Sequence, residues 1–334
     1  MSNIIVRRER EWLVPCIVMT FALALAALSL RPATGIGSGE FFSMFPTWAT
    51  YVLIAEICYL AIHLIKMMRE GVASPLAQFR YHFDWRKPAI LGFAALLSGF
   101  NMICFMWIKA EINLVAPFYA DEGIANIDRF IFGRDPWRFF ETMDLTVMAL
   151  TYNILWFWAL MITLFILLFA KPSADRSASL ISYFFLWSLF GPIGQYLVPA
   201  AGPIFYERIG LGDRYDGLHG NIPVITGDIA NYLWSHYSHK SLGLGAGISA
   251  MPSLHVATAT WMVISLKSIG SRLTIPVAVL GLYLYVGSVA LGWHYALDGV
   301  VGAVGAMLGH QIGLAYAKGY VAKATPLPSL AIAG

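Results

Sequence analysis

Two histidines and one aspartate in the C-terminal third of the chain have the types and spacing of a catalytic group. His294 and Asp298 are four residues apart, so at the start of a helix both side chains would lie on one face. A carboxylate at that distance can accept a hydrogen bond from one imidazole nitrogen, which fixes the tautomer and leaves the other nitrogen as a nucleophile or base. The alternative is that His294 is a structural residue at the membrane interface, hydrogen-bonded to a local carboxylate.

The second histidine, His255, lies in the segment Met251-Pro252-Ser253-Leu254-His255, which is typical of a helix start. Proline suits the first turn of a helix. The backbone amides around Ser253 to His255 then point outward at the positive end of the helix dipole, which is suited to a phosphate group. The glycine-rich approach at 243–247 would bring further amides close. Two apolar segments separate His255 from His294, so both histidines are expected at one membrane face.

The elements that position these residues are predicted to be membrane-spanning helices. The chain has 334 residues, of which 58% are hydrophobic and 12% charged, whereas soluble domains carry about 25% charged residues. This composition excludes a soluble globular protein and predicts an all-α, polytopic membrane helix bundle. The first apolar run is expected to be an uncleaved span. Eight apolar windows of spanning length occur, at 13–30, 47–65, 89–108, 145–170, 178–198, 252–269, 273–292 and 295–317.

The distribution of basic residues predicts the orientation of this bundle. With the N-terminus in the cytoplasm, most of the 22 lysines and arginines fall in segments assigned to the inside, and every short inside loop carries at least two. Both termini are therefore expected in the cytoplasm of a multi-pass inner or plasma membrane protein. His255 and His294 are expected on the periplasmic or extracytoplasmic face.

Two long connections are predicted on the outer side. The first, residues 109–144, mixes apolar and charged residues at helical spacing, which predicts short interfacial amphipathic helices broken at Gly133 to Pro136. Lys109 is interpreted as one of the outside charges and as one candidate partner for Glu56 in the second apolar window. The second connection, residues 199–251, is longer than a simple connecting loop, which is typical of a lid or binding surface. It leads directly into the His255 segment.

The last apolar window carries glycines spaced by four, at Gly305, Gly309 and Gly313. This spacing predicts a smooth face against which another helix packs closely. The three cysteines, Cys16, Cys58 and Cys104, all lie in apolar windows. They are interpreted as small core residues, without a disulfide framework or a metal cluster.

Taken together, the two histidine motifs resemble the type 2 phosphatidic acid phosphatase superfamily. Pro-Ser-Leu-His followed about 40 residues later by His-x-x-x-Asp, with a span between them, is the shared pattern. The form Met-Pro-Ser-Leu-His with His-Tyr-x-x-Asp is most similar to the inositol phosphorylceramide synthase-like (inositolphosphotransferase) branch. The resemblance covers roughly residues 89–317.

The resemblance implies a role for each motif residue. His294 would attack phosphorus and form a phosphohistidine intermediate, and Asp298 would orient and activate it. His255 would protonate the leaving oxygen, and Ser253 with its neighbouring amides would contact phosphate. These roles agree with the interpretation of the residues as a nucleophile, its orienter and an acid.

The chain departs from the superfamily pattern at its basic residues. Gln195 and Gly202 stand where the first motif has lysine and arginine, and Gly287 and Ser288 stand where the last motif opens with serine and arginine. A phosphoryl transition state still needs positive charge. The predicted substrate-binding donors are Arg208, Arg214, Lys240 and Gln195, with Arg208 ranked first and a loop salt bridge as its alternative.

These observations predict a three-part chain: an N-terminal two-helix extension (1–88), a catalytic core (89–320) and a cytoplasmic tail (321–334). The predicted function is a lipid phosphotransferase or phosphatase that passes a phosphoryl-bearing group to a lipid hydroxyl or to water. No cofactor or metal is predicted, and the expected partners are membrane lipids and lipid phosphates rather than nucleic acid. Two alternatives stay open: a metal-dependent membrane hydrolase with His255, His294 and Asp298 as ligands, and a non-catalytic lipid transporter.

Overall fold

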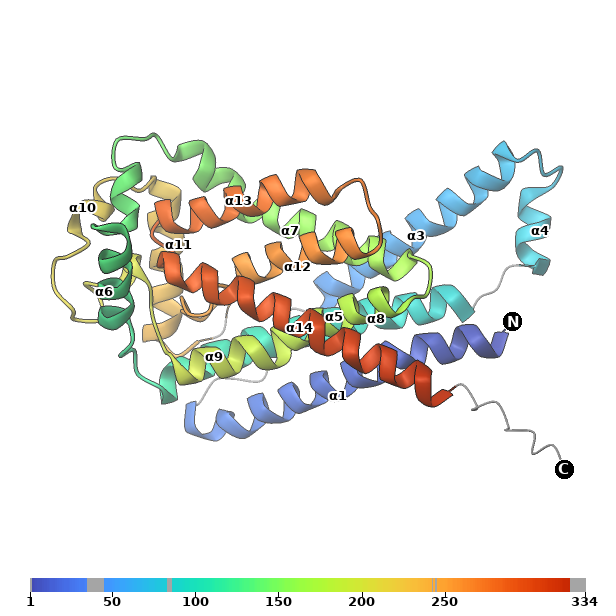
Figure 1. The fold of residues 1–334 in the computed structure, drawn as a ribbon, viewed down its shortest axis with the longest axis horizontal. Helices are drawn as coiled ribbons and strands as arrows, with labels where there is room; N and C mark the ends of the chain where they lie inside the picture. The colour runs from blue at the N-terminus through green and yellow to red at the C-terminus, as the bar shows by residue number, and fades with distance from the viewer. Residues whose placement is uncertain (1, 35–44, 83–85, 242, 244, 325–334) are drawn as a thin grey trace, which may run out of the picture.

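The computed structural model describes residues 2–34, 45–82, 86–241, 243 and 245–324. Within these ranges all regular structure is helical, as Figure 1 shows, which confirms the predicted all-α bundle. Helices suit such an apolar chain because they satisfy every backbone polar group internally when lipid surrounds them. The main helices are α1 (Ser2–Thr34), α3 (Phe45–Arg69), α5 (Arg86–Val115), α7 (Thr146–Phe169), α8 (Ala174–Phe185), α11 (Val224–Ser238), α12 (Leu254–Ser268), α13 (Thr274–Ala290) and α14 (Ala296–Ala324).

Each of the eight predicted windows coincides with a helical segment. In the described part of the chain, five segments are long and apolar enough to cross a membrane: Glu9–Arg31, Pro88–Val115, Thr146–Phe169, Ala174–Leu197 and Ala296–Tyr320. The α13 helix is apolar but has 17 residues, and α12 has 15. Spanning by α3, α12 and α13 stays a prediction.

The segment from Ala174 to Leu197 is continuous but changes its winding. After α8, residues Leu186–Phe190 form a π-helix (η2), and α9 (Gly191–Leu197) completes the segment. A π-helical turn widens the helix locally and often occurs at functional sites. Here Trp187 and Gly191 line the cavity that is described below.

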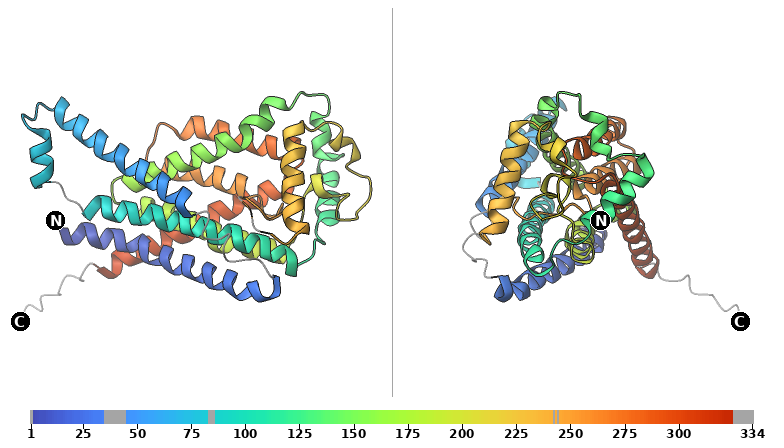
Figure 2. Two further views of the ribbon diagram at one scale, coloured as in Figure 1. Left: turned by 180° about the vertical axis from the view of Figure 1, so that it is seen from behind. Right: turned by 90° about the vertical axis from the view of Figure 1, so that its left-hand side faces the viewer.

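Short helices cover one end of the bundle, at the left of Figure 1. They are α6 (Asp121–Phe132), η1 (Pro136–Phe140), η3 (Pro203–Phe205), α10 (Asp216–His219) and α11. The predicted break between amphipathic helices is confirmed, because α6 ends at a left-handed Gly133 (φ +73°) and η1 begins at Pro136. The two views in Figure 2 place these helices across the bundle axis, away from the start of α1 and the end of α14. Which end faces the cytoplasm stays a prediction.

The core helix of the bundle is α12, which contacts α7, α8, α13 and α14. The predicted smooth face of α14 is confirmed: a side chain at Gly309 would lie 2.7 Å from Phe185, and one at Gly313 would lie 2.8 Å from the carbonyl oxygen of Ala178. Gly305 is in similar close contact with Phe190. These contacts fix α14 against α8 and η2, and so fix the helix that carries Asp298.

The first helix packs as part of this bundle. Trp12, Cys16, Leu23 and Ala27 of α1 are buried in the same core as residues of α5 and α8. Arg176 of α8 donates to both carboxylate oxygens of Glu9, at 2.9 and 3.1 Å. By contrast, α3 leads away from the bundle toward α4 (Pro75–His82) in Figure 1. The boundary of the predicted extension at residue 88 stays a prediction.

Candidate active site

A cavity of about 480 Å³ lies between the helix bundle and the short helices that cover its end. Its walls come from α5, α7, α9, α11 and α12, and from the loops at 245–252 and 293–294. Most of the lining is apolar, including Met102, Phe105 and Met106 of α5 and Tyr152, Trp156, Phe157 and Leu160 of α7. The polar side chains that line it are Lys109, Asn153, Gln195, Ser249, His255 and His294.

His294 lies in the short loop between α13 and α14 and is 5% exposed. Its Nδ1 is 2.8 Å from the carbonyl oxygen of Ala250 and 3.5 Å from Oδ2 of Asp298. Because a carbonyl oxygen can only accept, Nδ1 must carry the hydrogen. Nε2 then keeps its lone pair, and it belongs to a side chain that lines the cavity. The sequence predicted a tautomer fixed by Asp298, whereas in the structure the nearer acceptor for Nδ1 is the Ala250 carbonyl oxygen.

Asp298 is fully buried in the first turn of α14. Its Oδ2 accepts the amide hydrogen of Tyr295 at 2.8 Å, and its own carbonyl oxygen accepts the amide of Ser253 at 3.1 Å. The carboxylate is therefore held beside His294 by the start of its own helix. The same residue also ties α14 to the loop before α12, so it sets the relative position of the two histidine segments.

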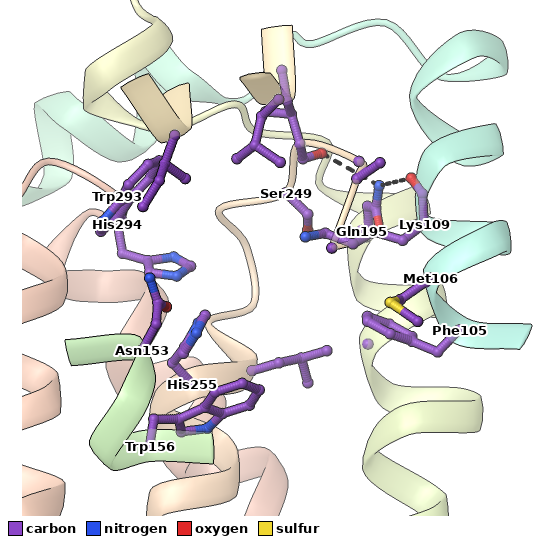
Figure 3. Close-up of a pocket in the computed structure, with 18 of the residues that line it drawn as sticks. Phe105, Met106, Lys109, Asn153, Trp156, Gln195, Ser249, His255, Trp293 and His294 are labelled. Atoms are coloured by element: carbon purple, nitrogen blue, oxygen red, sulfur yellow. Dashed lines mark hydrogen bonds between the residues drawn. The ribbon is translucent and has the colours of Figure 1, made fainter. Parts of the chain in front are cut away.

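His255 lies in the first turn of α12 and packs against the aromatic wall of α7. Its ring centroid is 4.4 Å from that of Trp156 and 5.1 Å from that of Tyr152. The ring centroids of His255 and His294 are 6.2 Å apart, and both side chains line the cavity (Figure 3). The structure thus brings together the three residues to which the sequence assigned chemistry.

Ser253 occupies the position before α12 and is fully buried. Its hydroxyl accepts the amide hydrogen of Val256 at 3.4 Å, so it acts as the N-cap and Pro252 lies outside the helix. This differs from the expected proline in the first turn. Pro252 and Leu254 line the cavity, and phosphate binding by Ser253 and its neighbouring amides stays a prediction.

Three of the predicted cationic donors lie away from the cavity lining. Arg208 donates to Asn231 at 2.6 Å, and Arg214 donates to Asp135 at 2.6 Å in an ion pair whose carboxylate is fully buried. Lys240 borders a smaller cleft beside α5. Gln195 does line the main cavity, and its amide nitrogen donates to the backbone oxygen of Lys109 at 2.8 Å.

One of the missing motif arginines has a steric reason. Gly202 has φ +101° and ψ 163°, a region open almost only to glycine, and a Cβ there would lie 2.6 Å from the carbonyl oxygen of Trp293. Ser288 is fully buried, and its carbonyl oxygen accepts the amide of His294 at 3.0 Å. A side chain at position 202 would therefore displace the loop that carries the nucleophile candidate.

Lys109 lines the cavity, although the sequence reasoning gave it no role in the site. It is partly buried on α5, and it is the sole lysine or arginine in the lining contributed by the described residues. In Figure 3 it lies with Gln195 on the wall opposite His255 and His294. A lysine inside an apolar helix is a functional candidate by default, and this signal was available in the sequence.

Two carboxylates of α6 also support the site. Asp121 accepts the amides of Ala201 and Gly202 at 2.8 and 2.7 Å and the hydroxyl of Tyr295 at 2.9 Å. Burial raises the pKa of Asp121, and these three hydrogen bonds oppose that rise by favouring the ionised form. The aspartate two helical turns later, Asp128, accepts from the start of α14. The seven-residue spacing of the two aspartates was the available signal.

The comparisons with known proteins agree with this geometry. The sequence model of the PAP2 superfamily matches residues 140–312, which include α7, α8, α12, α13, most of α14 and all three candidate catalytic residues. No curated protein and no solved structure matches the chain. The match spans slightly more than half of the 334 residues, and with the paired histidines and the long apolar helices it shows that this integral membrane protein belongs to the PAP2 superfamily.

Proposed function

We propose that this protein is a membrane phosphotransferase or phosphatase that cleaves a phosphoester of a lipid phosphate or phospholipid. Members of the PAP2 superfamily are generally phosphatases or phosphotransferases, which supports the class of reaction. The observation that carries the proposal is the state of His294. Its Nδ1 hydrogen is donated to the Ala250 carbonyl oxygen, and Oδ2 of Asp298 lies 3.5 Å from the same nitrogen, so Nε2 is free to attack. A second imidazole lies 6.2 Å away between ring centroids.

The first half-reaction uses the two imidazoles in turn. The Nε2 lone pair of His294 attacks phosphorus and forms a P–N bond. The P–O bond to the leaving alcohol breaks, its electron pair moves to oxygen, and protonated His255 donates a proton to that oxygen. The Asp298 carboxylate stabilises the positive charge that develops on the His294 ring.

The second half-reaction reverses these roles. Neutral His255 takes the proton from an incoming hydroxyl, and the oxygen attacks phosphorus. The P–N bond breaks and its electrons return to Nε2 of His294, which restores the starting state. Water as the incoming group gives a phosphatase, and a lipid hydroxyl gives a transferase of the inositol phosphorylceramide synthase-like kind.

The lining of the cavity supports a lipid substrate. Aromatic and aliphatic side chains of α5 and α7 extend from the level of His255 toward the bundle interior, as far as Met102 and Leu160. Residues 153 to 160 of α7 cover roughly 10 Å along the helix at 1.5 Å per residue. A lipid chain fits such a wall, whereas a fully polar substrate would leave it unmatched.

The metal-dependent alternative finds no support in the positions of the described side chains, because no three His, Cys, Asp or Glu residues among them are placed to hold a metal ion. The phosphotransfer proposal assigns its bond-forming, orienting and proton-transfer steps to His294, Asp298 and His255.

The decisive experiment uses detergent-purified protein with a panel of radiolabelled lipid phosphates and phospholipids, with and without ceramide or diacylglycerol. Wild type is expected to form an acid-labile, alkali-stable phosphoenzyme and then to release phosphate or a new headgroup-bearing lipid. His294→Ala is expected to lose both signals while unfolding at the same temperature. His239→Ala, at the exposed histidine that follows α11, is the matched control. Full turnover by His294→Ala on every substrate that wild type accepts would contradict the proposal.

A further inference from the structure

The cavity presents a strong imbalance of charge. Lys109 lines it, and no aspartate or glutamate does so among the residues that the structure describes. A lysine inside an apolar helix is costly unless its charge is compensated. His255 lines the same cavity, and its protonated form would add to the positive charge there. An anionic group entering the cavity would therefore compensate the charge of Lys109 and that of protonated His255.

The backbone and stem of Lys109 are held in place from two directions. Gln195 of α9 donates to the Lys109 carbonyl oxygen at 2.8 Å and also bonds to Asn113, one turn along α5. On the other side, the loop at Gly247 (φ +95°) approaches so closely that a Cβ there would lie 3.0 Å from Lys109 Cγ. These contacts fix the lysine stem against the wall of the cavity.

We propose that Lys109 is the phosphate-binding cation of this site, with Gln195 as the residue that positions it. The ammonium binds the non-bridging oxygens of a phosphate group held between the α5 wall and the two histidines on the opposite wall. Its role in turnover rests on the proposed phosphoryl transfer, in which charge on those oxygens must be stabilised. Phosphate binding itself does not require that reaction.

The test measures binding of inorganic phosphate to the full-length protein in detergent by isothermal titration calorimetry. Lys109→Met and Lys109→Gln both remove the charge, and each is expected to weaken phosphate binding on the order of 10- to 100-fold. Lys109→Arg keeps the charge and is expected to retain part of the affinity. Lys267→Met is the matched control, because that exposed lysine lies on α12 about 18 Å beyond His255. Size-exclusion profiles and unfolding temperatures verify that each variant is folded.

Three results would overturn the inference: wild-type affinity in both neutral variants, an equal loss in Lys267→Met, or absence of saturable phosphate binding in wild type. Binding by His294→Ala separates the two proposals. If His294→Ala binds phosphate normally and Lys109→Met does not, the cation site stands even when the phosphohistidine mechanism fails. Turnover assays with lipid phosphates then compare KM and kcat of Lys109→Arg with those of wild type. This comparison shows whether a lipid phosphate uses the same cation as free phosphate.

Discussion

The carboxylate of Asp128 on α6 accepts the amide hydrogen of Ala296 at 2.6 Å, and this contact caps the first turn of α14. Its other oxygen accepts the amide of Leu297 at 3.0 Å. The first amides of a helix have no partner within the helix. A helix at the surface of the bundle therefore completes the helix that carries Asp298 and begins two residues after His294.

The Asp128→Ala variant is expected to lose about 2–3 kcal/mol of unfolding free energy, because two buried amides lose their acceptor. Asp128→Asn keeps one acceptor oxygen and is expected to lose about half as much. Equilibrium unfolding in detergent measures both. The matched control is Glu122→Ala, at an exposed acidic residue on the same helix, expected within about 0.5 kcal/mol of wild type. Equal stability of the two alanine variants would contradict the capping role.

Replacing Gly202 is expected to damage the site through the loop before α14. Gly202→Ala combines backbone strain with a contact at 2.6 Å to the Trp293 carbonyl oxygen, and should cost about 2–4 kcal/mol and lower kcat. Gly210→Ala has a comparable φ of +84° with nothing within 4 Å of the new Cβ, so it isolates the strain alone. Thermal unfolding and turnover of the two variants give the comparison. A Gly202→Ala protein no worse than Gly210→Ala would refute the steric argument.

Asp298→Asn is expected to keep the fold and lose turnover. The asparagine oxygen can still accept the Tyr295 amide, but its NH₂ group cannot stabilise positive charge on His294. We expect kcat to fall about 10²- to 10⁴-fold, with an unfolding temperature close to that of wild type. Asp228→Asn, at an exposed position on α11, is the control. An active Asp298→Asn enzyme would remove the aspartate from the mechanism.

The ion pair between Glu9 and Arg176 is expected to hold α1 to the bundle. Arg176→Met leaves a carboxylate without its partner and should cost about 3–5 kcal/mol, whereas the Glu9→Met, Arg176→Met double variant should be closer to wild type. Lys66→Met breaks an exposed pair with Glu70 at 3.8 Å and should cost less than about 1 kcal/mol. A double-mutant cycle measures the coupling. Additive single effects would show that the pair contributes nothing specific.

Hydropathy predicted the long helices because lipid requires continuous apolar segments with internally satisfied backbones. The same reasoning placed His255 and His294 together, since two consecutive spans return the chain to its starting depth. The four-residue spacing of His294 and Asp298 predicted their contact on the basis of a shared helix face. In the structure His294 lies in the loop before α14, and it approaches Asp298 at the start of that helix. These inferences depend only on local periodicity and chain length.

The position of Lys109 in the cavity could not be predicted in this way. Arg208 and Arg214 were favoured because they are near the site along the chain, but their direction depends on how the loop folds, and each has a partner elsewhere. Lys109 is far from the histidines in sequence, and its place in the cavity depends on the rotation of α5 relative to α9. Asp121 and Asp128 looked like the polar face of an interfacial helix, because periodicity shows that a face exists without showing what covers it.

The long-range contacts of α6 have a consequence for biosynthesis. Asp121 and Asp128 leave the ribosome 174 and 168 residues before their partners Tyr295 and Ala296. Until α14 is inserted, Asp128 lacks its two amide partners and Asp121 has only the amides of Ala201 and Gly202, so α6 cannot complete its contacts with the bundle. The loop that carries His294 therefore acquires its geometry only at the end of translation. A nascent chain that is stalled before α14 would remain inert toward the surrounding lipids.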